Sequence, residues 1–552
     1  MKMKVRKDQI QATASKIVPI KCIQEADSVP VEDTVNREGY EAYSLPDKLR
    51  LVTMLNTLKL QPQYYRSENE QITELQKLIE KVALEDPYFV CQAIVWSRCM
   101  GEGMRTVNHL AAAFIAPFIS GQYYAKRFYS EFDKTTKRGG CIFRLDDMSE
   151  IKDAYFALTG KPLTNAMRKG FARVLSMSDT YQLSKYSKTV KDIANLSHPG
   201  YKLAGEKVTV DGEEIATLDA IMRGIKVQAN TWENNQSRVG QEVSEAVLKG
   251  DLSEEEAKVV LAEKKADNWE TLLRGGKLGI IAALRNIRNI MQNPRKETIE
   301  AWCCLVTDPG SIKRSLVLPV YFDLAYSTVT SEFLTNEFAP QVQQALLNGY
   351  EASIPNLSSI FVGSKTAVVV DCSGSMGSVM PCLEHNRGML RMGRFSTNRC
   401  SYKAGLIAAT IAKASKADIY KFGNRAIAFS YDVHENVFAL AKKIGTSEMG
   451  FTNAASAFEL ITKKGVVYDR IIFISDNEMN RELPSKKYAE YIRNVASPYI
   501  YAIDLAGYGT TPLANPGKVK YLFGYGPALY RSIASKEFKA ERYIKEIEKV
   551  II

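Results

Sequence analysis

The stretch from Thr366 to Met376 constrains the fold more than any other part of this 552-residue chain. It begins with the apolar, β-branched run TAVVVD, which ends at Asp371, and then changes abruptly to the small and oxygen-bearing residues CSGSM. Such a run is typical of a strand that is buried in a parallel sheet. In an open α/β sheet, ligands bind beyond the carboxyl ends of the strands. We therefore expect Asp371, Ser373 and Ser375 to lie at a ligand-binding position.

A second segment repeats this pattern further along the chain. The run YDRIIFIS over residues 468–475 predicts another buried strand, and Asp476 follows it directly. Between the two strands, Thr452 lies in a loop just before a helical run over residues 454–464. A carboxylate with neutral hydroxyls suits a hard cation such as Mg²⁺, which prefers oxygen ligands and takes few charged ones. Because most of the cation's charge would stay uncancelled, the site is expected to dock a carboxylate or phosphate from outside.

The order Asp-x-Ser-x-Ser, then a threonine, then an aspartate resembles the metal-ion-dependent adhesion site (MIDAS) of von Willebrand factor A domains. This resemblance implies that Ser373, Ser375 and Thr452 contact a divalent cation, most simply Mg²⁺. It also implies that Asp371 and Asp476 act largely through water. The alternative interpretation is a serine- and glycine-rich turn that only caps a helix.

Length and composition bound the class of protein. A chain of 552 residues is too long for one hydrophobic core, so two or three domains are expected. The hydrophobic content of 45% and the charged content of 24% are those of a soluble globular protein. The sequence has no apolar run of about 18 residues, and its basic N-terminus lacks the apolar segment of a signal peptide. We expect a cytoplasmic protein with no membrane partner.

The cysteines and the net charge further restrict the class of protein and its possible partners. The nine cysteines are scattered and form no Cys-x-x-Cys pair, so reduced thiols are expected rather than a zinc site. The formal net charge of +11 allows a polyanionic partner but does not prove one, because the local field decides binding.

The chain from about Leu45 to Leu347 has an almost wholly helical pattern, with apolar residues three and four positions apart and frequent Gly/Pro breaks. Some 300 residues of short helices predict stacked helix pairs that form a curved solenoid. Beyond residue 364, strand and helix patterns alternate, which predicts an α/β sheet covered on both faces. The predicted divisions are an extended arm over residues 1–30, a helical part over 31–360 and an α/β domain over 361–552.

Five short strings match a known pattern in their order along the chain: NREGY at 36–40, DPYFV at 86–90, LTNAMRKGF at 163–171, LSH at 196–198 and ALRNI at 283–287. They resemble stations of the TROVE module, which occurs in Ro ribonucleoproteins and in telomerase and vault proteins. This order, followed by a von Willebrand factor A domain, is similar to the Ro type over about residues 20–552. The resemblance implies a ring of HEAT-like helical repeats that is closed by a Rossmann-like von Willebrand factor A domain.

The Ro resemblance also implies a function. Proteins of this type bind small non-coding Y RNA on the outer surface and the single-stranded end of misfolded RNA in a central hole. They act in RNA quality control or stress response. We therefore expect a monomeric, RNA-binding ribonucleoprotein component without catalytic residues, with an exoribonuclease such as polynucleotide phosphorylase as a further partner.

Basic residues concentrate in one region of the helical part. Residues 121–200 contain fourteen Lys and Arg against eight Asp and Glu, a surplus of six in under a sixth of the chain. Tyrosines and phenylalanines, Tyr181 and Tyr186 among them, lie between these cations and could stack on unpaired bases. Phosphate binding by such a patch would be strongly salt-dependent. The alternative interpretation is a solvated helix face over core aromatics.

Seven residues are candidate RNA contacts. Lys169 and Arg173 lie four positions apart, so on a helix they would share one face. The Ro resemblance implies RNA contacts for Lys185, Lys191 and His198, although His198 could instead cap a helix. The complete set is Arg168, Lys169, Arg173, Lys185, Lys191, His198 and Arg285.

Two other classes of function remain possible from the sequence. The cation site and the solenoid could both serve a protein-interaction scaffold with no specific RNA ligand. A metal-dependent nuclease could use carboxylates alone, although the chain has only four histidines and no Gly-x-Ser-x-Gly elbow. We expect no enzyme activity, and steep salt dependence of RNA binding would distinguish the RNA-binding protein from the scaffold.

Overall fold

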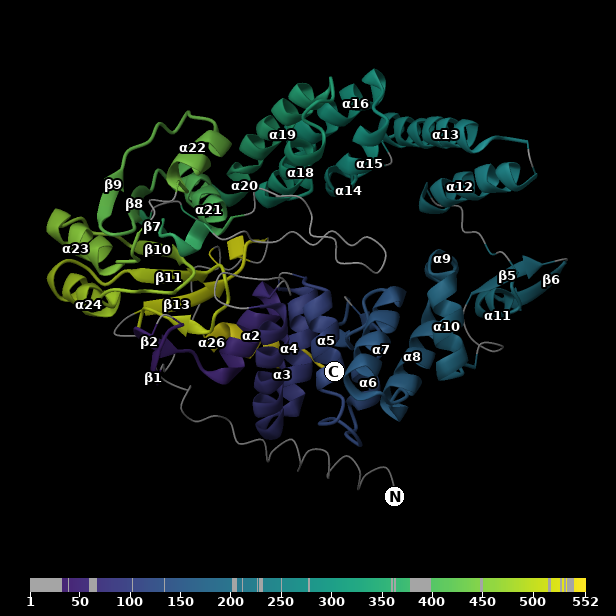
Figure 1. The fold of residues 1–552 in the computed structure, drawn as a ribbon, viewed down its shortest axis with the longest axis horizontal. Coiled ribbons are helices and arrows are strands. Elements are labelled where there is room, and N and C mark those ends of the chain that lie inside the picture. Colours follow the sequence, from purple (N-terminus) through teal and green to yellow (C-terminus); the bar gives the residue numbers. More distant parts are fainter. Residues whose placement is uncertain are drawn as a thin grey trace.

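The computed structural model combines a helical part with an α/β unit (Figure 1). It describes residues 32–37, 39–58, 67–101, 103–133, 135–200, 206–210, 212–225, 227, 232–249, 251–276, 278–358, 361, 364–377, 399–446, 450–514, 518–526, 529–530, 533 and 541–552. The predicted arm, residues 1–30, lies outside the described residues, so that prediction stays open.

The helical part runs through the first two thirds of the chain and curves as an arc in Figure 1. Its helices are α2 (Asp47–Thr57), α3 (Glu68–Glu85), α4 (Pro87–Cys99), α5 (Thr106–Phe114), α6 (Ala125–Phe128), α7 (Leu145–Thr159), α8 (Asn165–Met177), α9 (Thr180–Lys185), α10 (Ser187–Ser197), α11 (Thr217–Met222), α12 (Trp232–Lys249), α13 (Glu254–Arg274), α14 (Ile280–Arg285), α15 (Ile287–Gln292), α16 (Lys296–Thr307), α17 (Pro309–Arg314), α18 (Pro319–Glu332), α19 (Ala339–Ser353) and α20 (Pro355–Ser358). None of the described helices combines the length and the apolar character that a membrane span requires.

Capping residues explain why these helices begin where they do. The side chain of Ser67 accepts a hydrogen bond from the backbone N–H of Glu70, whose carboxylate accepts one from the N–H of Ser67 in return. Asp86 caps α4, and Pro87 occupies a first-turn position that needs no N–H donor. Ser253 begins α13 with a second reciprocal cap, and α13 packs against α12 as a helical hairpin.

Short antiparallel pairs interrupt the helical part, so the prediction of an almost wholly helical segment is wrong at these places. Strand β3 (Phe132–Asp133) pairs with β4 (Arg138–Gly139), and β5 (Lys207–Val210) pairs with β6 (Glu213–Ala216). A tight turn explains the second hairpin, because Gly212 has the left-handed φ of 87° that a residue without Cβ adopts at no cost.

The α/β unit contains a six-stranded sheet with helices on both faces. In spatial order its strands are β13 (Lys518–Phe523), β11 (Tyr499–Asp504), β10 (Arg470–Ser475), β7 (Thr366–Asp371), β8 (Asp418–Phe422) and β9 (Ala426–Phe429). All neighbours are parallel except β8 and β9, which are antiparallel and form a hairpin. Every residue of β7 and β10 is buried, as the continuous apolar runs predict. The helices of this unit are α21 (Cys400–Ser415), α22 (Val437–Ile444), α23 (Ala455–Lys464), α24 (Pro484–Asn494) and α26 (Glu541–Glu548).

The α/β unit contacts the end of the helical part that precedes it in sequence. Lys403 on α21 forms a buried ion pair with Asp323 on α18. On the same helix, Lys413 pairs with Glu351 of α19 over 3.1 Å. These contacts place the last helices of the arc directly against the sheet's covering helix.

The α/β unit also contacts the beginning of the helical part. The chain's last residues run from α26 to the first helices, where Gln92 Nε2 donates to the carbonyl oxygens of Glu548 and Val550, each over 2.8 Å. The carbonyl of Ile551 accepts from the N–H of Gly139 over 2.9 Å. Strand β1 (Glu32–Val35) pairs with β2 (Glu41–Ser44), which in turn pairs with β12 (Thr510–Thr511) of the α/β unit. The α/β unit is therefore joined to both ends of the arc.

Candidate functional site

The predicted cation site lies where two neighbouring strands end. Strands β7 and β10 are adjacent and parallel, Asp371 is the last residue of β7, and Asp476 follows β10 directly. From β7 the chain proceeds to β8 and β9 on one side of the sheet, and then crosses to β10, β11 and β13 on the other. Such a reversal of strand order opens the crevice in which α/β proteins bind ligands. The sheet thus places both predicted carboxylates at its switch point.

Hydroxyl and backbone donors hold Asp371 in this crevice. Its Oδ1 accepts from the backbone N–H of Ser373 over 2.9 Å, and its Oδ2 accepts from Ser475 Oγ over 2.6 Å. The hydroxyls of Ser373 and Ser375 lie 3.2 Å apart, and both serines are buried. The turn after β7 therefore gathers two hydroxyl oxygens and one carboxylate within a few ångströms.

The loop that carries Thr452 closes over the same end of the sheet. The N–H of Thr452 donates to Asn480 Oδ1 over 2.6 Å, which joins the loop to the segment after β10. The neighbouring N–H of Asn453 donates to the carbonyl of Gly423, just beyond β8, over 2.8 Å. A Cβ placed on Gly374 would lie 4.0 Å from the carbonyl oxygen of Gly450, so the two loops face one another. The side chain of Thr452 is buried.

The charge of the crevice fits a divalent cation. Burial raises the pKa of Asp371 to about 6, despite its hydrogen bonds to Ser475 and Ser373. The pKa of Asp476 rises well above its usual range, because the carboxyl group is buried and faces Asp371. Asp476 Oδ2 is buried and has no hydrogen-bond partner in the described part of the chain. A cation would supply that partner and relieve the repulsion between the carboxylates.

The set of charged groups is nevertheless small. Among the described residues, no group of three or more His, Cys, Asp or Glu side chains is arranged to hold a metal ion. The crevice offers two carboxylates with three hydroxyls, a composition suited to a cation that keeps several of its waters, as Mg²⁺ does.

The predicted RNA contacts on α8 are exposed at the surface. Arg168, Lys169 and Arg173 all have exposed side chains on this single helix, so Lys169 and Arg173 share a face as expected. Arg173 Nε lies 3.2 Å from Glu131 Oε1, which also pairs with Arg127 over 3.1 Å. Arg173 is thus partly neutralised by a surface carboxylate, an ion pair that water screens strongly.

A cluster of cations and aromatic rings lies on the next helices. Lys185 Nζ donates to the hydroxyl of Tyr181 over 3.0 Å and lies 5.8 Å from the centroid of the Tyr186 ring. Arg144 Nε donates to the hydroxyl of Tyr186 over 3.0 Å, and its guanidinium lies 5.6 Å from that ring. These four side chains, Arg144, Tyr181, Lys185 and Tyr186, form what we call the cation–tyrosine cluster. It presents both charge and ring faces at one place.

Two further predicted RNA contacts, Lys191 and His198, lie on α10 and at its C-terminal end. Lys191 is half-buried on the helix, whereas His198 is exposed at its C-terminal end. The N–H of His198 donates to the carbonyl of Ala194 over 2.9 Å, and its φ of 51° is left-handed. The backbone of His198 therefore ends the helix while its side chain faces solvent, so capping and contact with a ligand are compatible.

Comparison with solved protein structures identifies the fold of this chain. Structures of six chains match this protein, among them "Crystal structure of Deinococcus radiodurans RO (RSR) protein". The match covers 89% of this chain and 100% of the Deinococcus radiodurans chain, with a TM-score of 0.54 and 14% sequence identity. The chain has a Ro fold. No model of a protein family and no curated protein matches the sequence.

The Ro fold accounts for the joint presence of the helical arc and the α/β unit. The match spans nearly the whole chain rather than one part, so the predicted combination of a helical part with an α/β domain is confirmed. Closure into a ring and the von Willebrand factor A type of the α/β domain stay predictions. The division at residues 30 and 360 stays a prediction, and β1 and β2 pair with the α/β unit although they precede the helices in sequence.

Within the Ro fold, the seven candidate RNA contacts do not form one surface. Six of them lie on or at the ends of α8, α9 and α10, and α10 packs against both of the other helices. Arg285 ends α14 in a different stretch of the arc (Figure 1). Any RNA that touches both places must therefore cross between two regions of the helical part.

Sequence reasoning missed several partners of these sites. Ser475 and Asn480 contact Asp371 and Thr452, but hydroxyl and amide side chains are too common near strand ends to stand out in a sequence. Glu478 is fully buried beside them, where its carboxylate accepts from the N–H of Arg37 over 2.9 Å and from the hydroxyl of Thr510. The one available signal was the spacing of Asp476 and Glu478, which places two carboxylates just after a buried strand.

Proposed function

We propose that this protein is an RNA-binding member of the Ro family, with a metal-dependent α/β domain of the von Willebrand factor A type. The observation that carries the proposal is the Ro fold over 89% of the chain, combined with exposed cations next to accessible rings on α7 to α10. In this view the arc and the α/β unit enclose a central opening. The contacts of the α/β unit with both ends of the arc support such a closed arrangement.

The basic surface on α8 to α10 is proposed to bind structured, non-coding RNA of the Y type. Lys169 and Arg168 would pair with phosphates, because both are exposed and neither forms an ion pair among the described residues. The cation–tyrosine cluster would accept an unpaired base on a ring while its cations neutralise the adjacent phosphates. The single-stranded end of a misfolded RNA would occupy the central opening, and an exoribonuclease would be recruited for decay.

At the switch point, Ser373, Ser375 and Thr452 are proposed to hold Mg²⁺ directly, with Asp371 and Asp476 holding its waters. A bound cation there would supply an electrophilic point for a carboxylate or phosphate of a partner. The support is the pair of buried carboxylates with raised pKa values and the buried, unsatisfied oxygen of Asp476. The protein's own part is to orient the hydroxyls and the two carboxylates in the crevice.

Filter binding of a labelled hairpin RNA at several salt concentrations tests the RNA-binding proposal. The wild-type protein is expected to lose affinity steeply as salt rises, because each neutralised phosphate releases a counterion. The double variant Lys169→Gln/Arg173→Gln is expected to bind about tenfold more weakly and to show a smaller salt slope. The matched control is Lys249→Gln/Lys258→Gln, which removes the same charge from the exposed tip of the α12–α13 hairpin. Equal losses in both variants would mean that net charge alone drives binding.

A protein-interaction scaffold is the second candidate. It is favoured by one observation: Phe451, next to Thr452, is 48% exposed, and the guanidinium of Arg481 lies 4.0 Å from its ring centroid. Such an exposed ring with a cation at the edge of a metal site suits an acidic protein partner. If the hairpin RNA bound without salt dependence while an acidic peptide bound only with Mg²⁺, the scaffold would replace the RNA-binding proposal.

A further inference from the structure

A single loop connects the cation crevice to the antiparallel pair of β1 and β2, which we call the N-terminal hairpin. This loop, residues 476–480, follows β10 and is called the β10 loop. It begins with Asp476, which faces the crevice, and ends with Asn480, whose Oδ1 accepts from the N–H of Thr452 over 2.6 Å. The middle of the loop instead contacts the turn between β1 and β2. The crevice and the N-terminal hairpin therefore share one loop.

Three hydrogen bonds hold the middle of the β10 loop. The side-chain amide of Asn36, in the turn of the hairpin, donates to the carbonyl of Met479. The next residue along the turn, Arg37, donates its N–H to Glu478 Oε2 over 2.9 Å. The hydroxyl of Thr510, on β12, donates to the other carboxylate oxygen of Glu478 over 3.1 Å. Because Glu478 and Met479 are buried, acceptors left without these donors would cost free energy.

The backbone of the β10 loop depends on such contacts for its shape. Asn477 has a left-handed φ of 67°, which residues other than glycine rarely adopt. Its N–H donates to Ser475 Oγ over 2.9 Å, and the N–H of Glu478 donates to Asp476 Oδ1 over 3.3 Å. A backbone in such a conformation persists only where its surroundings hold it. The position of Glu478 therefore helps to set the orientation of the Asp476 carboxylate.

The turn of the N-terminal hairpin is itself attached to the first helices of the arc. The guanidinium of Arg37 pairs with Glu74 on α3 over 2.6 Å and lies 5.4 Å from the centroid of the Tyr508 ring. The side chain of Asn36 accepts from the N–H of Tyr40 over 3.0 Å, which closes the turn. Contacts thus run without a break from α3, through the turn and the β10 loop, to the cation crevice.

We propose that Asn36 and Arg37 are positioning residues of the cation site, because they hold the β10 loop in the shape that places Asp476 in the crevice. The site is then complete only while the N-terminal hairpin is attached to the α/β unit. Cation binding and attachment of the hairpin therefore strengthen one another. The proposal rests on the Mg²⁺ site of the proposed function and extends that site to a segment at the other end of the chain.

Isothermal titration calorimetry with Mg²⁺ on the full-length protein tests the effect of the hairpin on the site. Asn36→Ala, which removes the amide that donates to Met479, is expected to weaken Mg²⁺ binding about tenfold, as for coupled sites. The matched control is Gln92→Ala. It removes the amide that holds the chain's last residues against α4 rather than the β10 loop, and it is expected to bind Mg²⁺ like the wild type.

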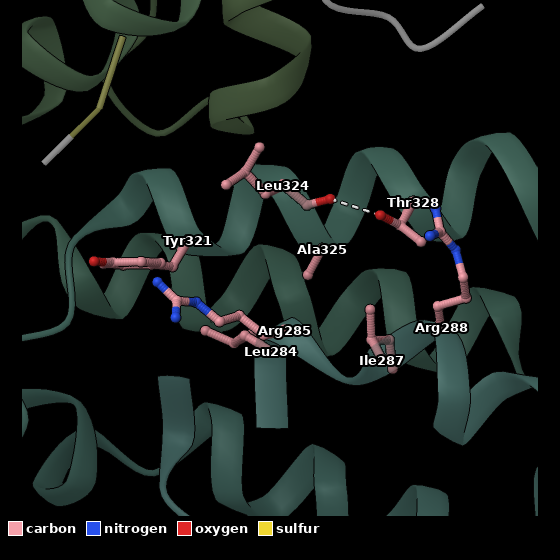
Figure 2. Close-up of a pocket in the computed structure, with 8 residues that line it drawn as sticks. All are labelled: Leu284, Arg285, Ile287, Arg288, Tyr321, Leu324, Ala325 and Thr328. Carbon is pink, nitrogen blue, oxygen red and sulfur yellow. Dashed lines mark hydrogen bonds between the residues drawn. The ribbon is translucent and has the colours of Figure 1, made fainter. Parts of the chain in front are cut away.

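A second set of variants keeps the test decisive if Asn36→Ala does not fold. Thr510→Val removes the hydroxyl that donates to Glu478 and is expected to weaken Mg²⁺ binding about fivefold, the worth of one hydrogen bond. Thr510→Ser keeps the hydroxyl and is expected to keep the affinity. The control is Thr328→Val near the other end of the arc, where Figure 2 shows the hydroxyl bonded to the carbonyl of Leu324 in a pocket between α14, α15 and α18.

Hydrogen exchange gives the reciprocal measurement, which a merely structural role of the hairpin would not change. Saturating Mg²⁺ is expected to slow exchange of the backbone N–H groups of β1 and β2 about tenfold, because linkage makes the two effects equal. In Asp476→Asn, which removes a carboxylate of the site, Mg²⁺ is expected to give no such protection. The β5–β6 hairpin is expected to exchange equally with and without Mg²⁺.

The outcomes distinguish this role of the hairpin from the cation site itself. If Asn36→Ala and Thr510→Val bind Mg²⁺ as tightly as the wild type, the role of the hairpin is overturned and the cation site stands. If the wild type does not bind Mg²⁺, both fail. Equal weakening in Asn36→Ala and Gln92→Ala would show that any loosening between the α/β unit and the arc lowers the affinity, which contradicts a specific positioning role.

Discussion

Two buried groups of charges in this protein differ in how they are balanced. In the helical part, Asp147 is fully buried but accepts from Arg98 and Arg105, each over 3.1 Å, and lies 3.0 Å from His109. In the α/β unit, Asp371 and Asp476 are equally buried but face one another and serine hydroxyls, with no cation among the described residues. Negative charge is thus neutralised inside the protein at one site and left uncompensated at the other.

The pKa shifts follow this difference. Burial would raise the pKa of Asp147, but the hydrogen bond to His109 and the charge of Arg98 outweigh it, so the pKa is lowered. For Asp371 and Asp476, the effect of burial outweighs that of the hydrogen bonds, so the pKa of each carboxyl group is raised. A buried charge whose partners lie inside the protein becomes costly only when one of these partners is removed, whereas a buried charge without partners lowers the stability of the fold unless a cation binds to it. The comparison therefore indicates a structural role for the first cluster, whereas metal binding at the second remains our proposal.

The largest expected effect is on the balanced cluster. Asp147→Ala removes the partner of three cations and the acceptor for the N–H groups of Phe143 and Arg144 at the start of α7. Breaking a buried ion pair in this way costs about 3–5 kcal/mol of unfolding free energy. Urea denaturation measures this loss, and Asp153→Ala on the same helix, with a side chain that is 69% exposed, is the matched control. A similar small loss in both variants would remove the contrast between the two clusters.

The second expected effect is on the unbalanced pair and has the opposite sign. Without metal, Asp476→Asn is expected to leave the free energy of unfolding equal or higher, because it removes a buried charge that lacks a partner. With Mg²⁺ at a hundred times its dissociation constant, the wild type is expected to gain about 2.7 kcal/mol and the variant nothing. Denaturation in EDTA and in Mg²⁺ measures both, with Glu337→Gln at an exposed position as control. A wild type that is indifferent to Mg²⁺ would contradict the metal site.

The carboxylates of the proposed cation site could be predicted from the sequence, whereas the contacts of the proposed RNA-binding surface could not, and the reason is physical. Asp371 and Asp476 could be found because each follows a buried apolar run, and parallel strands bring their carboxyl ends together. The pairing of Arg173 with Glu131, and of Arg144 with Tyr186, depends on how separate helices pack, which their own periodicity does not specify. The hairpin of β5 and β6 could have been predicted, because an Asp-Gly pair at residues 211–212 separates two short alternating runs.

The smallest expected effect is a pH dependence that belongs to the balanced cluster. Burial alone would lower the pKa of His109, but hydrogen bonds to Asp147 and Glu150 outweigh it and raise the pKa above 6.5. Because the folded-state pKa is the higher one, the protonated histidine stabilises the fold fully below about pH 6.5, and this contribution is lost as the pH rises through the folded value. The size is about 1.4 kcal/mol for each unit between the two pKa values.

Measuring the free energy of unfolding of the wild type and of His109→Gln between about pH 6 and pH 9 tests this prediction. The difference between them is expected to shrink steadily with rising pH, and His434→Gln, at an exposed histidine, is the matched control. The raised pKa of Asp371 gives a fall in metal-free stability over a lower range, from about pH 4 to about pH 6, because the folded state holds its proton longer. Adding Mg²⁺ is expected to change the pH dependence of the unfolding free energy only in this lower pH range. If it altered the His109 range as well, the two clusters would be coupled, and the separation between a structural and a binding role would not hold.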